Sequence, residues 1–100
     1  MFHFVYVLES KSKTNQIYIG YYPENVNERV EKHNRGEVFS TKPYRPWELI
    51  FYEAYLNQDD ALRRERYLKT NQGSRALKFM LRKHRELSKK PGSGAKHTTR

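Results

Sequence analysis

Apolar runs and polar breaks alternate along the chain and predict its elements. Residues 3–8 and 17–22 are rich in Phe, Val, Ile and Tyr, and the polar stretch 10–16 between them indicates a β-hairpin. Residues 47–55 form the most apolar run, which favours a central strand covered on both faces. The pattern therefore predicts three strands, two of them in the N-terminal hairpin.

A helical pattern follows the second strand. Pro23 can open a helix, because the first turn does not need its missing N–H. Val26, Val30 and Asn34 recur at four-residue steps, the spacing that places side chains on one helix face. Gly36 is typical of the residue just past a helix end. We therefore expect a first helix between Pro23 and Gly36.

Two further helices are expected after the third strand. Asp59 and Asp60 favour a helix N-terminus, where carboxylates interact well with free backbone N–H groups. The apolar face of that helix consists of Ala61, Leu62 and Leu68. After a break at residues 71–73, Ser74 is a good cap for a third helix. Its apolar positions are Leu77, Met80 and Leu81. The predicted order is β-β-α-β-α-α, which is an α+β fold.

Length and composition limit the class of protein. One hundred residues without an internal repeat predict a single domain with one modest core. The chain contains no cysteine, which excludes disulfides and thiolate metal sites. The four histidines lack the paired spacing of a zinc site; they are His3, His33, His84 and His97. No apolar stretch approaches the roughly 18 residues of a membrane span, and the N-terminus lacks a basic signal region. We therefore expect a soluble cytoplasmic protein that is not exported.

The net charge of +9 is unevenly distributed. Residues 1–62 carry seven Lys and Arg against nine Asp and Glu, whereas residues 63–100 carry thirteen against two. Such a basic C-terminal part favours a polyanion as partner, because each cation near a phosphate releases counterions. A solvated pair of basic helices is the alternative. We expect a domain at residues 1–86 and a basic disordered tail at 87–100, because the tail has too few apolar residues to bury.

Glu65 is the first candidate site residue. Its spacing from Ala61 and Leu68 places it on the apolar stripe of the second helix, where an unpaired carboxylate is costly. One interpretation is an ion pair with Arg29, Arg64 or a neighbouring strand. The other is a magnesium ligand, because magnesium tolerates a single protein carboxylate when water and substrate phosphate complete its shell. Periodicity alone leaves both open.

Arg29 and His33 are four residues apart in the first expected helix and therefore lie on one side of it. Arginine offers a planar fork for a phosphate, and histidine exchanges a proton near neutral pH, which together suit phosphodiester cleavage. The alternative is a solvated helix face, because Glu28, Glu31 and Lys32 surround these two residues.

Tyr6 and Tyr18 lie in the two strands of the expected hairpin. Core packing is the simplest role for either, since the chain contains eight tyrosines. They would share a chemical role only if both hydroxyls pointed at one place, near a group such as Arg29, His33 or a metal. Gly20 either permits a close approach of backbone or substrate, or marks a plain bulge.

These residues occur in an order and spacing that resembles a known family. The elements of the pattern are Phe4-Val5-Tyr6, Tyr18-Ile19-Gly20 after eleven residues, Arg29, His33, Asn34, Gly36, Thr41-Lys42, Arg45-Pro46-Trp47 and Ala61-Leu62-Arg63-Arg64-Glu65. This pattern resembles the GIY-YIG nuclease superfamily, in its small single-domain bacterial (UPF0213-like) branch. The resemblance covers about residues 2–83.

The resemblance implies the GIY-YIG endonuclease fold, a three-stranded antiparallel sheet flanked by helices, and cleavage of nucleic acid with one divalent ion, Mg²⁺ or Mn²⁺. Carried over by position, Tyr6 and Tyr18 would be the paired active-site tyrosines, one of which helps to activate the attacking water. Arg29 would neutralise charge on the scissile phosphate, His33 would relay a proton, and Glu65 would hold the metal.

We therefore expect a divalent-metal-dependent endonuclease that acts on nucleic acid, DNA rather than RNA, in DNA repair or recombination. Its sequence specificity should be low, because the chain has no separate recognition domain and phosphate contacts orient without specifying sequence. The residues expected to contact phosphates are Arg63, Arg64, Arg66, Lys69, Arg75, Lys78, Arg82 and Lys83. No membrane partner or small-molecule cofactor is expected. The alternative is a non-catalytic nucleic-acid-binding module of the same fold.

Overall fold

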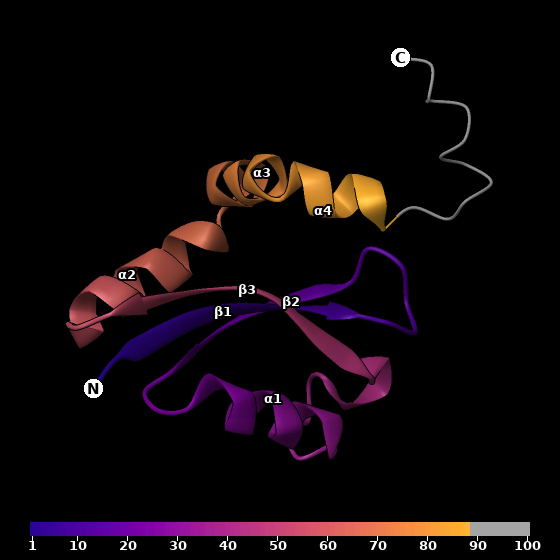
Figure 1. Ribbon diagram of the computed structural model, residues 1–100, viewed down its shortest axis with the longest axis horizontal. Helices are drawn as coiled ribbons and strands as arrows, with labels where there is room; N and C mark the ends of the chain where they lie inside the picture. The colour runs from indigo at the N-terminus through magenta and orange to yellow at the C-terminus, as the bar shows by residue number, and fades with distance from the viewer. Residues whose placement is uncertain (89–100) are drawn as a thin grey trace. The chain divides into compact units, whose positions relative to one another are not determined.

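The computed structural model describes residues 1–88 and contains a three-stranded antiparallel sheet with helices (Figure 1). Strand β1 spans His3–Ser10, β2 spans Ile17–Tyr22 and β3 spans Trp47–Tyr55. Both β2 and β3 pair antiparallel with β1, in the order β2-β1-β3. The predicted hairpin, the α+β class and the antiparallel sheet are confirmed.

The expectation that residues 47–55 form the central strand is wrong, because β1 occupies the centre and β3 lies at an edge. Residues 5–8 of β1 are all fully buried, so both faces of this strand are covered. In β3, by contrast, Tyr52 is 52% exposed. Strand order depends on pairing between distant segments, and the hydrophobicity of one segment does not reveal it.

Helix α1 spans Val26–Asn34 and begins later than Pro23 predicted. The Asn25 side chain accepts a hydrogen bond from the backbone N–H of Asn27 at 2.9 Å and caps the N-terminus. The side chain of Pro23 has no acceptor for such a hydrogen bond, so the helix begins after Asn25, which has one. At the other end Gly36 has a φ of 81°, which confirms its predicted place just past the helix.

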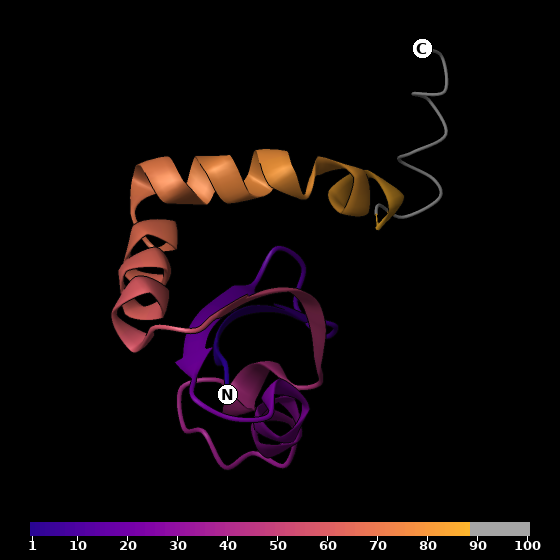
Figure 2. The same ribbon diagram turned by 60° about the vertical axis from the view of Figure 1, so that its left-hand side comes forward.

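Helix α1 covers one face of the sheet (Figures 1 and 2). Tyr6 and Leu8 from β1 meet Val26 and Trp47 in a buried cluster on this face. Because side chains alternate along a strand, the two buried valines of β1 point to the other face. The packing of α1 therefore depends on the even-numbered residues of the central strand, which include Tyr6.

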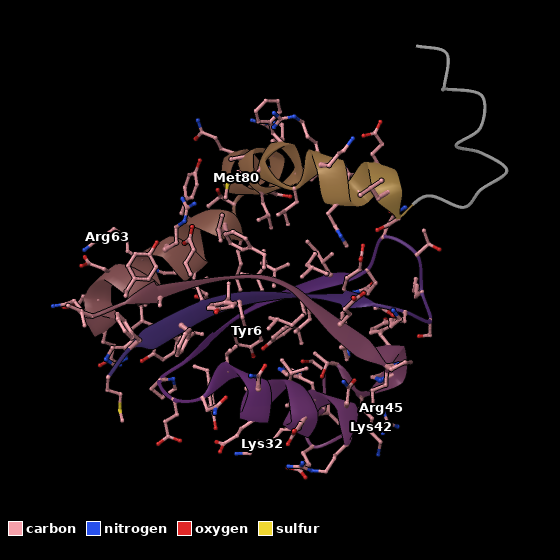
Figure 3. All side chains as sticks on the ribbon, in the orientation of Figure 1. Tyr6, Lys32, Lys42, Arg45, Arg63 and Met80 are labelled. Atoms are coloured by element: carbon pink, nitrogen blue, oxygen red, sulfur yellow. The ribbon has the colours of Figure 1, made fainter. Side chains whose placement is uncertain are left out.

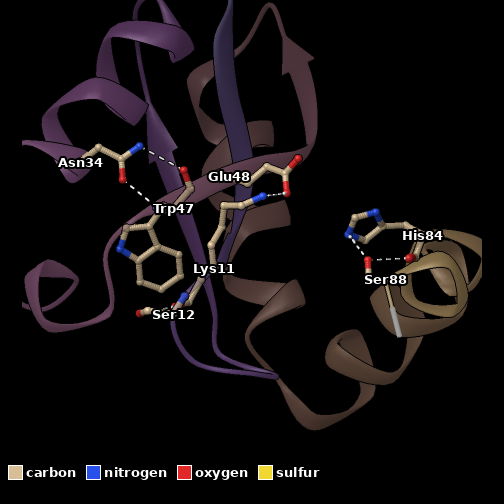
Figure 4. A network of polar contacts seen from close by, with 8 residues as sticks. Lys11, Ser12, Asn34, Trp47, Glu48, His84 and Ser88 are labelled. Atoms are coloured by element: carbon tan, nitrogen blue, oxygen red, sulfur yellow. Dashed lines mark hydrogen bonds and ion pairs between the residues drawn. The ribbon is translucent and has the colours of Figure 1, made fainter. Parts of the chain in front are cut away.

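The loop from α1 to β3 is fixed by side-chain hydrogen bonds. Its middle forms a short 3₁₀ helix, η1, at Lys42–Tyr44, which the sequence pattern did not predict. The Asn34 amide donates to the Trp47 carbonyl at 3.0 Å, and its oxygen accepts from the Trp47 N–H at 2.6 Å (Figure 4). The Ser10 hydroxyl donates to the Tyr44 carbonyl at 2.7 Å. These bonds hold the loop beside the C-terminus of α1.

Helix α2 spans Gln58–Leu68, with the two predicted aspartates in its first turn. Arg64 forms two hydrogen bonds with Glu53 of β3: Nε to Oε1 at 3.0 Å and Nη2 to Oε2 at 3.2 Å. Glu53 is the register partner of Val5, and opposed residues of a sheet point to the same face. Helix α2 is therefore attached to the sheet face opposite α1.

The chain divides into a sheet unit, Met1–Tyr67, and a helical unit after it. Among the described residues, the helical unit contains α3 at Asn71–Met80 and α4 at Arg82–Leu87. Helix α4 was not predicted, so residues 1–88 contain one α-helix more than β-β-α-β-α-α, in addition to η1. The Ser88 hydroxyl donates to the His84 carbonyl at 2.8 Å at the end of α4 (Figure 4).

The start of α3 also differs from the prediction. Thr70, and not Ser74, is the N-cap: its hydroxyl oxygen accepts a hydrogen bond from the Gly73 N–H at 3.0 Å. Gly73, which was expected in a break, lies buried inside the helix. Both Thr70 and Ser74 can cap a helix, so local preference does not distinguish between them.

The predicted tail begins at the last residue of α4, and its residues from 89 onward lie outside the described part of the chain. The division predicted at residue 86 therefore stays a prediction.

Among residues 1–88, no helix is long and apolar enough to cross a membrane.

Candidate active site

The hydroxyl group of Tyr6 connects the central strand with α1. Tyr6 is 0% exposed, and Figure 3 shows it between the sheet and the helix. Its oxygen lies 2.8 Å from Nε2 of His33 and accepts a hydrogen bond from Nε of Arg29 at 3.4 Å. Three of the predicted site residues therefore meet at one buried atom.

Thr41 determines which nitrogen of His33 carries the proton. The Thr41 hydroxyl donates its single hydrogen to the Val38 carbonyl at 3.3 Å. The same oxygen lies 2.8 Å from Nδ1 of His33, and with its own hydrogen on the Val38 carbonyl it accepts the Nδ1–H there. In neutral His33 the opposite nitrogen, Nε2, is then an acceptor, and the Tyr6 hydroxyl donates to it. This tautomer is assigned from the hydrogen-bond network.

The pKa values of both groups favour their neutral forms. Burial, and to a smaller extent the positive charge of the neighbouring Arg29 guanidinium, together lower the pKa of His33 to about 4. Burial also raises the pKa of Tyr6 to about 12, although the hydrogen bond from Arg29 opposes that rise. At neutral pH the pair is therefore a neutral phenol that donates to a neutral imidazole.

Tyr18 on β2 completes an aromatic group around His33. Its ring centroid lies 4.9 Å from that of His33 and 6.1 Å from that of Tyr6. Tyr18 is half-buried, whereas Tyr6 has no exposed surface. The two tyrosines that the motif spacing pairs are therefore adjacent, and Tyr18 is the one that reaches solvent.

Gly20 provides the space that the two tyrosines occupy. Gly20 is the register partner of Tyr6 in the regular ladder between β1 and β2. A Cβ atom on Gly20 would lie 2.6 Å from Cζ and from the hydroxyl oxygen of Tyr6, and 2.9 Å from Cε2 of Tyr18. The sequence left open whether Gly20 permits a close approach or marks a bulge. The structure shows a close approach, and the group that approaches Gly20 is the ring of Tyr6.

Arg29 has donors that remain available to a ligand. Among residues 1–88, Nε is the one nitrogen of its side chain with a hydrogen-bond partner, and the guanidinium makes no ion pair. Its Cζ lies 5.3 Å from the ring centroid of Tyr22, which orients the group by a cation–π contact. Nζ of Lys32 lies 5.8 Å from the same ring. Arg29 and Lys32 are thus both held beside Tyr22, and Arg29 also contacts Tyr6.

Glu65 lies on α2 and is half-buried. The contacts that join Tyr6, Tyr18, Arg29 and His33 do not include it, and α2 is attached to the sheet face opposite the one on which these four residues meet. Its role as the metal ligand therefore remains a prediction. Among residues 1–88, no group of three or more His, Asp or Glu side chains could together hold a metal ion. The predicted arrangement needs only one protein carboxylate, because magnesium keeps several water ligands.

Two residues that hold the site together were not assigned a role from the sequence. Thr41 fixes the tautomer of His33, and Asn34 ties the end of α1 to Trp47. Both belong to the motif pattern that indicated the family, which was the one available signal. Their partners are eight and thirteen residues away in the chain, so helix or strand periodicity could not identify them.

The eight basic residues expected to contact phosphates lie in different surroundings. Arg64 is held by Glu53, and its side chain is 28% exposed. Arg63 pairs with Asp60 at 3.0 Å on the surface, and Lys83 pairs with Glu86 at 3.4 Å. The exposed members are Arg63, Arg66, Lys69, Arg75, Lys78, Arg82 and Lys83. Arg64 is therefore the member least available to a phosphate.

Comparison with known proteins gives the class to which this fold and site belong. The sequence profile of the GIY-YIG catalytic domain matches residues 2–78. The chain therefore belongs to the GIY-YIG family, a family of nuclease domains, as its motifs predicted.

The chain is similar to UPF0213 proteins of Staphylococcus aureus, including those of strains Mu3, Mu50 and COL. Each is 40% identical over 79 residues, which span 78% of this chain and 93% of the relative. Their names state no activity. No solved structure matches the chain significantly.

Proposed function

We propose that the chain is a divalent-metal-dependent endonuclease that hydrolyses phosphodiester bonds of DNA with low sequence specificity. The observation that supports this proposal most is the buried Tyr6 hydroxyl, which donates to neutral His33 and accepts from Arg29. A hydrogen-bonded set of phenol, imidazole and guanidinium combines a proton route with a cation for an anionic substrate.

Arg29 would bind the scissile phosphate with its two terminal nitrogens, since Nε is already directed at Tyr6. The fixed guanidinium would stabilise the charge that develops as the attacking oxygen bonds to phosphorus. The bound phosphate would also offset the positive field of Arg29, which lowers the pKa of His33 in the free protein. Substrate binding should therefore make His33 a better proton acceptor.

Tyr18 would contact the attacking water, because it is only partly buried and Tyr6 has no exposed surface. The proton lost by the water would reach Nε2 of His33 through the phenol hydroxyls. The last step of that route exists already in the bond from Tyr6 to His33, at 2.8 Å. Tyr6 would therefore serve to position His33 and Arg29 and to pass on the proton.

Glu65 would hold one Mg²⁺ or Mn²⁺ ion, with water and phosphate oxygens as its other ligands. Carboxylate oxygen suits both ions, and a half-buried side chain can reach both protein and solvent. When bound, such an ion polarises the phosphate and stabilises the leaving oxygen. With a single protein carboxylate, the ion would bind firmly only together with the substrate.

The exposed basic residues of α2, α3 and α4 would contact backbone phosphates and account for low sequence specificity. The preference for DNA over RNA follows from the resemblance alone. It is tested in the same experiment as the activity.

The proposal is tested by incubating the purified full chain with single-stranded, duplex and branched DNA, and with RNA, in Mg²⁺ or Mn²⁺. We expect the wild type to cut DNA and Glu65→Gln to lose at least 100-fold in rate, about 3 kcal/mol of transition-state stabilisation. Glu24→Gln is the matched control, because it makes the same charge change at an exposed loop residue. It should cut like the wild type.

Cleavage that persists in Glu65→Gln, or in excess chelator, would refute the metal role. A wild type that binds these nucleic acids and cuts none of them would support the non-catalytic module instead. Tyr18→Phe should slow the cutting step more than Tyr6→Phe does. If Tyr6→Phe slows the cutting step more, Tyr18 is not the residue that contacts the water.

A further inference from the structure

An open groove lies next to the site, in the loop between α1 and β3. It has a volume of about 680 Å³. Its lining residues are Asn34, Phe39, Ser40, Lys42, Pro43, Tyr44, Arg45 and Pro46. We refer to it as the Phe39 groove. None of these residues has a part in the chemistry proposed above.

Phe39 is exposed to an unusual degree for a phenylalanine. Its exposed fraction is 91%, so the ring contributes almost nothing to the core. A single exposed apolar side chain is common on protein surfaces and has no meaning by itself. The polar groups around Phe39 therefore decide what its ring could bind.

The charged side chains among the lining residues are two cations, Lys42 and Arg45, and the lining contains no acid. Lys42 and Arg45 are both exposed, and among residues 1–88 neither makes an ion pair. Nε of Arg45 donates to the Lys42 carbonyl at 3.0 Å, so the two side chains start from one fixed turn (Figure 3). By contrast, Lys11 and Arg35 on the same unit pair with carboxylates. The groove thus has positive charge available for an anion.

The groove is held rigidly to the candidate active site. Thr41, at the centre of the loop, is 2% exposed and hydrogen-bonded to His33. Asn34 lines the groove and directly follows His33 in α1. A ligand in the groove would therefore lie beside residues that contact the proposed proton acceptor.

We propose that the Phe39 groove binds an unpaired segment of the nucleic-acid substrate, with one base stacked on Phe39 and adjacent phosphates on Lys42 and Arg45. The inference rests on the proposed function and names its substrate class. An exposed ring can stack with a base only if that base is not already stacked inside a duplex. The groove therefore favours substrates with a single-stranded flap, gap or loop beside the cleavage site.

Binding is measured without cleavage, using the Glu65→Gln full chain in chelator and fluorescein-labelled DNA. The probes are a 12-nucleotide single strand and a blunt duplex of the same sequence. The length lies within the range of known single-strand binding sites, about 4–16 nucleotides. We expect Phe39→Ala to weaken single-strand binding about 10-fold and duplex binding less than about twofold. Phe2→Ala, which removes another exposed phenyl group, should change neither.

Phe39→Trp gives a direct signal for stacking. The new indole should retain single-strand affinity, and its fluorescence should be quenched by the single strand and not by the duplex. Trp47 is 4% exposed and supplies a constant background, which the parent chain measures. Lys42→Ala and Arg45→Ala should each reduce the slope of log K against log salt concentration by about one, the value for one lost phosphate contact.

Equal affinity of Phe39→Ala and parent for the single strand would overturn the proposal, as would equal losses on single strand and duplex. Melting temperatures within about 2 °C of the parent would show that the variant is folded, because an exposed ring adds little stability. Phe39-dependent single-strand binding by a wild type that never cuts would refute the nuclease activity and support the groove. If Phe39→Ala cuts every substrate as fast as the parent, the role of the Phe39 groove is refuted and the nuclease activity is not.

Discussion

Replacing Thr41 with valine tests whether the proton on His33 is placed by this threonine. Valine has the same shape as threonine and lacks the hydroxyl, so the change removes one polar group from a residue that is 2% exposed and leaves no cavity. The change removes the acceptor that lies 2.8 Å from Nδ1 of His33. Since His33 is 0% exposed, water cannot replace the lost partner.

The free-energy cost follows from that unpaired group. A buried N–H without an acceptor costs about 1–3 kcal/mol. His33 can avoid part of this cost by moving its proton to Nε2. It would then donate to the Tyr6 oxygen, which reverses the hydrogen bond and removes the proton acceptor. We therefore expect Thr41→Val to lose about 1–3 kcal/mol of unfolding free energy and about 100-fold in the cutting rate, with little change in substrate affinity.

Thr41→Ser is the matched control, because it keeps the hydroxyl and loses a methyl group, at a cost of about 1 kcal/mol. Urea denaturation measures both stabilities, and single-turnover cleavage measures both rates. The ¹⁵N chemical shifts of the His33 ring report the tautomer directly. If Thr41→Val retains the Nδ1–H form, or cuts as fast as Thr41→Ser, then Thr41 does not place the proton and the reasoning fails.

Three further predictions concern the same unit. Gly20→Ala should lose about 1–3 kcal/mol of stability and most of the cutting activity, because the new Cβ would lie 2.6 Å from the Tyr6 hydroxyl oxygen. Urea denaturation and cleavage assays measure these two effects. Asn34→Asp should lose about 1 kcal/mol, because a carboxylate oxygen would replace the donor to the Trp47 carbonyl; Trp47 fluorescence follows the unfolding. The third prediction is pH dependence: His33 has a folded pKa of about 4, below its ordinary 6.5, so the unfolded chain takes up this proton first as the pH falls. Stability should fall between about pH 6.5 and 4, by at most about 1.4 kcal/mol per pH unit from this residue.

Each of these predictions has an outcome that contradicts it. Full activity of Gly20→Ala would mean that the Tyr6 ring can shift without consequence. An unchanged denaturation midpoint for Asn34→Asp would show that the bonds to Trp47 add no stability. For the pH dependence, His33→Gln is the reference, because it cannot titrate. A stability curve with the same slope in both proteins would show that burial does not lower the pKa of His33.

Several features of the fold could be predicted from local sequence because short-range physics determines them. The two N-terminal strands were found from their β-branched and aromatic residues, and Gly36 marked the end of α1 because its backbone has a positive φ. The position of α3 was less accurate, since Thr70 and Ser74 offer the same capping chemistry. Local signals therefore identify the type of an element better than its first residue.

The residue types of the candidate site were also evident from the sequence. The motif spacing selected Tyr6, Tyr18, Arg29 and His33, and the structure brings these four together. The helical spacing of Arg29 and His33 already placed them on one side of α1. The proposed role of Glu65 rests on the resemblance and on its helix position.

The tertiary structure decided what those residues do to one another. Tyr6 and His33 are 27 residues apart, and only the central position of β1 beneath α1 brings their polar atoms within 2.8 Å. That contact buries both groups, which shifts both pKa values, and it requires the absence of a side chain at Gly20. Sequence determines which chemical groups the chain carries. Burial and pairing between distant segments determine their protonation, because both depend on surroundings that no local pattern describes.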